Sequence, residues 1–258
     1  MESDIEQSAR SVPRLDGNET PPASLIAQAR ELSWYHTLEL APGFVTEGWF
    51  DLRPYIDHYG LPERMDGMRV LEVGTWDGFW AFEMERRGAA VVAIDLDDES
   101  ELDWPPRRRP SKSPEVPRGR AFRLAREMLD SKVERINLSV YDARPEDLGT
   151  FDLVFCGSVL IHLRDQLRAL ERIAALCTGT FISAEEYDRM TNRFPLPLAR
   201  YRANVEASVV YWRPNARAWK QMMWTAGFDR VSERCRFTMD SKQGFSVRHL
   251  VLHGLKER

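Results

Sequence analysis

Two acidic residues and two glycines in the first half of the chain have the types and spacing of a nucleoside-binding site. Residues 69–78 read Arg-Val-Leu-Glu-Val-Gly-Thr-Trp-Asp-Gly, so an apolar run carries Glu72 and then reaches a turn with Gly74 and Gly78. A second apolar run ends at Asp95, 21 residues after Gly74. A carboxylate about 20 residues beyond such a turn can accept hydrogen bonds from both hydroxyls of a ribose. The pattern therefore predicts a strand, a ligand-binding turn, a helix and a second strand that ends in a carboxylate.

The composition of the turn indicates which ligand it binds. A dinucleotide fingerprint needs a third glycine, because a pyrophosphate must approach bare backbone at the helix N-terminus. Here the bulky Trp76 and the acidic Asp77 stand between the two glycines. We expect Asp77 to be the N-cap of a helix over residues 78–87, and Glu72 to accept from an ammonium group. A ligand with an amino acid and a ribose, such as S-adenosylmethionine, fits best. A nicotinamide or flavin cofactor, or a turn that binds nothing, are the alternatives.

Length, charge and cysteine content argue against several classes of protein. With 258 residues, 43% of them hydrophobic, the chain suits one domain with a sizeable core and an N-terminal extension. No apolar run reaches the roughly 18 residues of a membrane span, and the N-terminus lacks the pattern of a signal peptide. The three cysteines lack metal-ligand spacing, which is typical of a reduced, cytoplasmic protein without zinc. The net charge of −4 gives no general attraction for nucleic acid.

Strand-like and helix-like segments alternate along the chain. Besides the segments around the turn, we expect helices over residues 23–34, 120–130, 165–177 and 214–226, and strands over residues 133–140, 151–157, 180–184, 231–237 and 246–253. Repeated strand–helix units imply an α/β fold with a mostly parallel, Rossmann-like sheet and helices on both faces. The last two strands are predicted to form an antiparallel hairpin at the sheet edge. Such sheets bind ligands at the carboxyl ends of their strands.

The domain organisation follows from the remaining segments. Residues 1–22 are predicted to be a flexible tail, residues 23–67 a helical extension that covers the cofactor, and residues 68–258 the nucleoside-binding domain. Residues 96–119 turn from acidic to basic and contain five prolines, so they are a solvated loop or a gate. Residues 185–213 follow a strand on the ligand face and are rich in Arg, Tyr and Trp, which favours a lid over the substrate.

Four stretches match a known pattern: residues 34–52, 70–95, 151–170 and 212–228. The third begins Phe-Asp-Leu-Val-Phe-Cys-Gly-Ser-Val-Leu-Ile-His-Leu-Arg-Asp, and the fourth begins Trp-Arg-Pro-Asn and ends Ala-Gly-Phe. On these motifs the chain resembles the class I S-adenosylmethionine-dependent methyltransferases. It is most similar to the tRNA wobble-uridine carboxymethyltransferase group and its smaller bacterial relatives. The second stretch is diagnostic of the superfamily, although Trp76 replaces the usual middle glycine.

The resemblance implies a set of cofactor-binding residues. The methionine portion would contact Glu72, Gly74 and Gly78, the ribose Asp95, the adenine amino group Asp142, the sulfonium Gly157 and Ser158, and other parts of the cofactor Tyr35, Trp49 and Trp76. Alternatives stay open for some of them. Asp142 is otherwise a turn cap, Gly157 and Ser158 a plain turn at a strand end, and Trp49 an ordinary core residue.

Two positions bear on the form of the cofactor. The similar carboxymethyltransferases recognise a carboxylated cofactor with a lysine and a tyrosine, and here Tyr35 and Ile161 stand at those positions. A buried carboxylate needs a cation or strong hydrogen-bond donors, and Ile161 offers neither. We therefore expect plain S-adenosylmethionine and a methylated product.

The expected chemistry is an in-line displacement, in which the enzyme chiefly aligns the nucleophile and excludes water. A base helps if the acceptor is protonated, and His162 is the best candidate, unless it is only a residue at a helix start. Glu185 and Glu186 are alternative bases or amine binders. The acceptor is expected to contact lid residues, or these form a dimer interface instead: Arg200, Tyr201, Arg202 and Trp212.

The leading hypothesis is a methyltransferase that acts on an oxygen or nitrogen of a small biosynthetic molecule, without a metal, as a monomer or homodimer. A tRNA-modifying enzyme is the runner-up, in which the basic residues 107–126 would contact RNA. A cofactor-binding fold that performs no methyl transfer is the third hypothesis.

Overall fold

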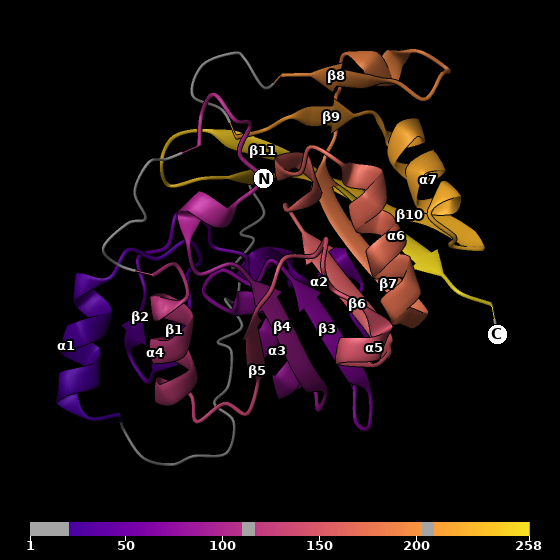
Figure 1. Ribbon diagram of the computed structural model, residues 1–258. Helices are drawn as coiled ribbons and strands as arrows, with labels where there is room; N and C mark the ends of the chain where they lie inside the picture. The colour runs from indigo at the N-terminus through magenta and orange to yellow at the C-terminus, as the bar shows by residue number, and fades with distance from the viewer. Residues whose placement is uncertain (1–20, 110–116, 203–208, 258) are drawn as a thin grey trace, which may run out of the picture.

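A seven-stranded sheet forms the centre of the computed structural model (Figure 1), which describes residues 21–109, 117–202 and 209–257. The strand order is β10-β11-β7-β6-β3-β4-β5. In chain order the strands are β3 (Arg69–Val73), β4 (Ala90–Asp95), β5 (Glu134–Asn137), β6 (Phe151–Gly157), β7 (Cys177–Glu186), β10 (Arg230–Asp240) and β11 (Ser246–Leu255). The first five run parallel, and the last two form an antiparallel hairpin at one edge. The predicted α/β sheet is therefore confirmed.

Helices cover both faces of the sheet. One face packs against α1 (Ala23–Glu31), α2 (Ile56–Tyr59), α3 (Phe79–Arg86) and α4 (Arg120–Met128). The other packs against α6 (Gln166–Leu176) and α7 (Ala216–Thr225), and the short α5 (Pro145–Leu148) contacts α6. Successive residues of a strand point to opposite faces of the sheet. Val70 therefore packs in the hydrophobic core on the first face, and Leu71 packs in the core on the second. The N-terminal extension thus shares a core with the sheet.

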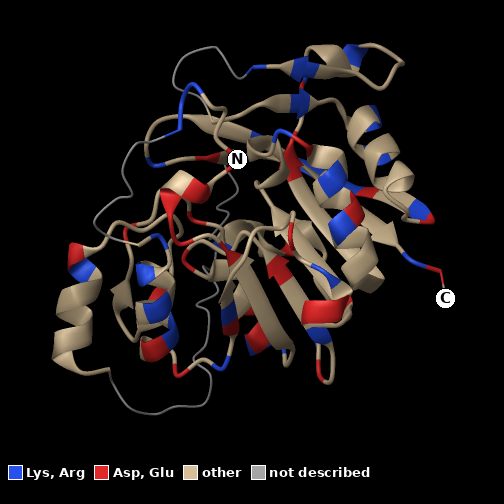
Figure 2. Ribbon diagram, in the orientation of Figure 1, with Lys and Arg blue, Asp and Glu red and all other residues tan. Residues whose placement is uncertain are grey.

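Two short antiparallel pairs lie outside the main sheet. The first, β1 (Glu39–Ala41) with β2 (Phe44–Val45), belongs to the N-terminal extension, and the second, β8 (Ala199–Tyr201) with β9 (Trp212–Pro214), belongs to the insertion after β7. Figure 1 shows β8 and β9 at the top of the molecule and α1 beside α4 at the lower left. Acidic and basic segments are interspersed along α4 and α6 (Figure 2).

Several predicted boundaries shift for local reasons. The predicted helix 23–34 ends at Glu31. The predicted strand 133–140 is shorter in the structure, where β5 ends at Asn137. The chain turns after it, and the Asp142 amide donates to the Ser139 carbonyl oxygen at 3.0 Å. The prediction that Pro214 begins a helix is wrong, since Pro214 ends β9. Asn215 is the N-cap of α7 instead, and its side chain accepts from the Ala218 amide at 2.9 Å.

Three predicted segments extend beyond the described residues. Residues 1–20 of the predicted tail, residues 110–116 of the predicted gate and residues 203–208 of the predicted lid fall outside the ranges given above.

Candidate functional site

A cavity of about 1060 Å³ lies at the carboxyl ends of β3, β4 and β6. That volume is at the upper end for sites that bind small molecules. Nine of the residues predicted to bind the cofactor line it: Tyr35, Trp49, Glu72, Gly74, Trp76, Asp95, Asp142, Gly157 and Ser158. Gly78 is not among the lining residues, because it packs behind the turn, where an added Cβ would meet Phe82 Cε2 at 2.3 Å.

The turn after β3 has a backbone that requires glycine at its start. Gly74 has a φ of +78°, and an added Cβ would lie 2.2 Å from Val159 Cγ2. Trp76 also has a positive φ, +50°, which is uncommon for a bulky residue. Its amide donates to Asp95 Oδ2 at 2.7 Å, so the carboxylate at the end of β4 holds the turn in place.

Asp95 has a fixed orientation at the edge of the cavity. Besides the Trp76 amide, the Leu96 amide donates to its other oxygen, Oδ1, at 2.8 Å. Each carboxylate oxygen can accept more than one hydrogen bond. The side chain is thus oriented by backbone donors and still has lone pairs for hydroxyl groups of a ligand.

Glu72 is buried beside the cavity without full hydrogen bonding. It is 2% exposed, and its Oε2 has no hydrogen-bond partner among the described residues. Burial raises the pKa of this carboxyl group to about 8. A buried oxygen without a partner costs free energy, so a cationic ligand group at this place would be stabilising.

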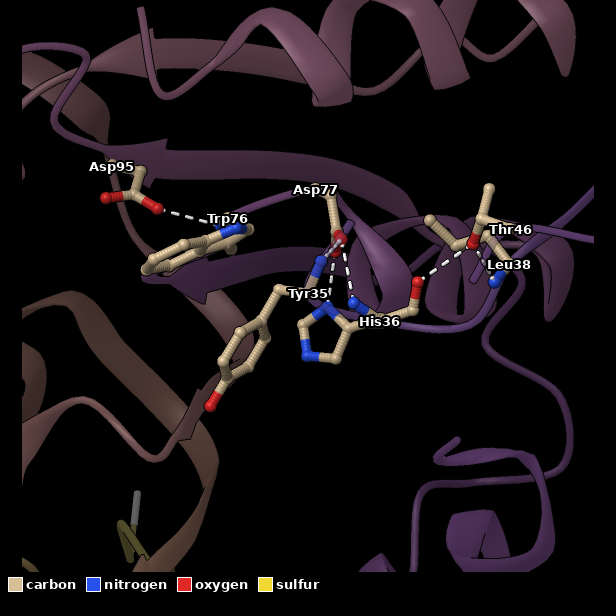
Figure 3. A network of polar contacts seen from close by, with 7 residues as sticks. All are labelled: Tyr35, His36, Leu38, Thr46, Trp76, Asp77 and Asp95. Carbon is tan, nitrogen blue, oxygen red and sulfur yellow. Dashed lines mark hydrogen bonds and ion pairs between the residues drawn. The ribbon is translucent and has the colours of Figure 1, made fainter. Parts of the chain in front are cut away.

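Asp77 does not cap α3, and that prediction is wrong. The N-cap residue is Gly78, and the Asp77 side chain turns toward the N-terminal extension instead (Figure 3). Asp77 Oδ2 accepts from the amides of Tyr35 and His36, both at 2.8 Å, and Oδ1 contacts His36 Nδ1. Asp77 is fully buried, so it ties the extension to the ligand-binding turn.

The opposite end of the cavity lies beyond Asp95. It is lined by consecutive residues from the end of β5 onward, Asn137 to Asp142, and by Leu102 and Trp104 from the segment after β4. Asp142 lines the cavity and is also part of the turn described above, so both of its predicted roles stay open. A mixed apolar and carboxylate wall of this kind can contact the faces of a planar base and accept from its amino group.

The strand end after β6 holds a serine–histidine pair. Ser158 has a φ of +56°, and its Oγ lies 2.8 Å from Nε2 of His249 on β11. His249 is 1% exposed, and burial lowers its pKa to about 4. The pair is therefore neutral at neutral pH, and it fixes the Ser158 hydroxyl at the cavity wall.

The two predicted bases differ in access to the cavity. His162 lines it, and its Nδ1 lies 3.1 Å from the Val209 carbonyl oxygen, while burial lowers its pKa. Glu185 does not line the cavity. Its Oε1 accepts from the amides of Val159 and Leu160, and it is 1% exposed, so it stabilises the turn after β6 rather than facing a substrate.

The residues predicted to bind the acceptor lie outside the cavity lining. Arg200 forms an ion pair with Asp188 at 2.7 Å, and the Tyr201 and Trp212 rings contact each other at 4.7 Å between centroids. Arg202 does not line the cavity either. From the described part of this insertion, Glu186, Val209, Val210 and Tyr211 line it instead. Arg200 and its neighbours contact other parts of the insertion, which sequence spacing alone does not indicate.

Aromatic rings cover one side of the cavity. Tyr35 lies 4.8 Å from the Trp76 ring and 6.0 Å from the Trp49 ring, and the Arg118 guanidinium stacks on Trp76 at 4.0 Å. Trp49 is 46% exposed, so it is not a core residue. Among these, Arg118 is not predicted from the sequence, and neither are the cavity residues His36 and His249. The aromatic context of residues 34–36 is the one signal that could have indicated His36.

The described ranges contain neither a metal-binding cluster nor a membrane-spanning helix. No group of three or more His, Cys, Asp or Glu side chains there could hold a metal ion. None of the helices in residues 21–109, 117–202 and 209–257 has the length and apolar character needed to cross a bilayer.

Comparison with known proteins shows which family the sequence matches. Residues 47–233 match the family described as "Methyltransferase domain". A ubiquinone biosynthesis O-methyltransferase from Vibrio parahaemolyticus is 30% identical over 118 residues, which are 44% of this chain and 42% of that protein. The protein of the same name from Xanthomonas campestris is 32% identical over 125 residues, with shares of 47% and 43%. The chain therefore spans less than half the length of the curated relatives it matches.

Solved structures agree on the fold. The N-terminal domain of EvdMO1 with S-adenosylhomocysteine bound has a TM-score of 0.63 and 17% identity, over 91% of this chain and 97% of that one. The structure of EvdMO1 itself gives 0.58 over 90% of this chain and 47% of that one, also at 17% identity. At this level of identity the likeness is one of fold, and the fold is that of a Rossmann-like methyltransferase.

Proposed function

The chain belongs to the methyltransferase-domain family, and we propose that it is an S-adenosylmethionine-dependent methyltransferase of a small-molecule acceptor. The observation that carries the proposal is the convergence of Glu72, Asp95 and Asp142 on one cavity. Their carboxylates suit an ammonium group, a ribose and an adenine amino group, which are the polar groups of this cofactor. A dinucleotide would bring its pyrophosphate to the turn after β3, where Trp76 replaces the glycine that lets phosphates approach the backbone.

The residues of the cavity fit the cofactor. Glu72 Oε2 is buried without a partner among the described residues, so an ammonium group there would supply the missing hydrogen bond. Asp95 is oriented by two backbone amides, so little ordering is needed when it accepts from ribose hydroxyls. When bound, S-adenosylmethionine supplies an electrophilic methyl group.

We place the acceptor beside His162, Glu186 and Tyr211, which line the cavity near Ser158. The Nδ1–H of His162 donates to the Val209 carbonyl oxygen, which leaves Nε2 as the acceptor nitrogen. Burial lowers the pKa of His162, so the imidazole is neutral at neutral pH and can take a proton from an acceptor hydroxyl. The apolar side chains of Val209 and Val210 would exclude water. Arg200, Tyr201, Arg202 and Trp212 would then support the lid from behind rather than contact the acceptor.

The matched relatives favour an oxygen acceptor. Both are named ubiquinone biosynthesis O-methyltransferases, and their similarity covers less than half of each protein. Carboxymethyl transfer to tRNA is the weaker proposal. Ile161 lines the cavity at the position where a donor to a carboxylated cofactor would be needed, and its side chain has no donor.

Mass spectrometry can test the proposal. The protein would be incubated with S-adenosylmethionine carrying a deuterated methyl group, together with a small-molecule extract or with a tRNA pool. We expect the label in a small molecule, and much less label with Asp95→Ala as the control at the same cofactor concentration. Label in tRNA alone would favour the RNA-modifying function. Label in neither pool, with the cofactor bound, would favour a fold that binds the cofactor without methyl transfer.

A further inference from the structure

His36 lines the cavity and contacts Asp77, and neither residue has a role in the reaction proposed above. Asp77 is fully buried and accepts the amides of Tyr35 and His36, and its Oδ1 contacts His36 Nδ1 (Figure 3). A buried carboxylate is costly unless charge and hydrogen bonds compensate it. The two amides and the imidazole nitrogen that contact Asp77 belong to two consecutive residues, so Asp77 fixes where the His36 ring lies.

The His36 backbone is held on its other side as well. Thr46 Oγ1 donates to the His36 carbonyl oxygen at 2.9 Å and accepts from the Leu38 amide at 2.8 Å (Figure 3). The His36 backbone is therefore held on two sides, and the contact of Nδ1 with Asp77 fixes the ring. With Nδ1 committed to Asp77, Nε2 lies on the far side of the ring from Asp77 (Figure 3), and His36 lines the cavity. Such a side chain is preorganised to donate one hydrogen bond into the cavity.

The amino-acid part of the cofactor needs a second polar partner. It is a zwitterion, and Glu72 can accept only its ammonium group. The carboxylate still requires a cation or strong donors once it leaves water. His36 lies next to the start of α3, where helix N–H groups also favour an anion, and its ring is 5.7 Å from that of Phe79, the first residue of the helix.

We propose that His36, held by Asp77, binds the carboxylate of the amino-acid part of the cofactor; this rests on the proposed function. In the complex, Nδ1 donates to Asp77 and Nε2 donates to the ligand carboxylate, so the ring with both N–H groups bridges two carboxylates. Asp77 is a positioning residue, because it acts on the ligand through His36.

Arg118 is another cation that lines the cavity. Its guanidinium stacks on Trp76, and its Nε is buried without a partner among the described residues. However, the Arg118 amide donates to the Asp97 carbonyl oxygen at 3.0 Å, so the backbone of this residue lies beside the segment that follows Asp95. His36 lies on the side of α3, where Glu72 and Gly74 would hold the methionine portion. Arg118 is therefore the matched comparison.

Calorimetry with S-adenosylmethionine and two analogues can separate the contribution of His36 to carboxylate binding from that of Arg118. Decarboxylated S-adenosylmethionine lacks only the carboxylate, and methylthioadenosine lacks the whole amino-acid part. The variant His36→Asn keeps a donor to Asp77 near the Nδ1 position but loses Nε2, and His36→Gln places a neutral donor near Nε2. Arg118→Ala is the control. Methylthioadenosine binding reports whether each variant keeps an intact site.

We expect the wild-type protein to prefer S-adenosylmethionine over its decarboxylated form by about 10- to 100-fold, as for a charge-assisted hydrogen bond. His36→Asn should reduce this preference to less than about threefold, His36→Gln should restore part of it, and Arg118→Ala should leave it unchanged. Asp77→Asn should weaken the preference in the wild type but not in His36→Asn, because coupled residues are not additive. The His36 and Asp77 variants should bind methylthioadenosine within about twofold of the wild type.

Three results would overturn the inference. They are a preference that survives in His36→Asn, a preference that is lost only in Arg118→Ala, or an equal loss of all three ligands in His36→Asn. If the wild type binds none of the three ligands, the proposed function itself fails, so the two failures can be told apart.

Discussion

Replacing Glu72 with glutamine should abolish a proton release that accompanies cofactor binding. Burial raises the pKa of this carboxyl group to about 8, so about nine-tenths of the molecules carry the proton at about pH 7. A ligand ammonium group beside it favours the carboxylate and lowers that pKa. Binding should therefore release about 0.9 proton from Glu72 at about pH 7, and less than about 0.1 at about pH 9.5, where the group is already ionised.

Titration calorimetry in buffers with different ionisation enthalpies counts these protons. The difference between the wild type and Glu72→Gln isolates Glu72, because every other titrating group is shared. Glu185→Gln is the matched control. Burial raises the pKa of Glu185 to about 8 as well, but Glu185 does not line the cavity, so this variant should release as many protons as the wild type. Equal proton release by the wild type and Glu72→Gln at about pH 7 would refute the role given to Glu72.

Three further variants test other parts of the site. Asp95→Ala should weaken S-adenosylhomocysteine binding by about 2 to 4 kcal/mol in calorimetry, because ribose hydrogen bonds to a charged acceptor are lost; unchanged affinity in a folded variant would remove the assignment. His162→Ala should lower kcat by about 100-fold or more with little change in cofactor affinity. In the wild type, kcat should rise with pH through a pKa below the ordinary value of about 6.5, since burial lowers it; a loss under about threefold would favour a structural role. Gly74→Ala should lower the free energy of unfolding by about 2 kcal/mol or more in urea denaturation, because its Cβ would meet Val159 at 2.2 Å. Gly67→Ala, with a φ of +73° and no atom within 4 Å of the added Cβ, should show only the smaller backbone cost of about 1 to 2 kcal/mol. Equal effects of the two glycine substitutions would contradict the steric account.

The parts of the fold that depend on local pattern were predictable. The apolar run at residues 151–157 forms β6 with those ends, and the carboxylate of Asp95 does lie at the end of β4, next to the turn. Strand periodicity and the spacing of the turn decide both features within a few residues of sequence. The edge hairpin of β10 and β11 was likewise predictable, although both strands are longer than predicted because they pair along their whole length.

The parts that depend on contacts between distant segments were not predictable. Asp77 has the sequence context of an N-cap, yet its partners lie 41 and 42 residues earlier in the chain. Glu185 follows a strand that ends at the ligand face, but amides 25 and 26 residues earlier take its carboxylate away from the cavity. The pairing of Ser158 with His249 spans 91 residues. Sequence rules based on neighbouring residues cannot predict hydrogen-bond partners that are this far apart in the chain.

Binding of S-adenosylhomocysteine to the wild-type protein tests the central claim most directly. Calorimetric titration should show a saturable site that NAD⁺ does not occupy, because Glu72 and Asp95 suit an ammonium group and a ribose, while Trp76 replaces the glycine that lets a pyrophosphate approach the turn. Binding of NAD⁺ with the higher affinity, or no binding of S-adenosylhomocysteine to the folded chain, would contradict it.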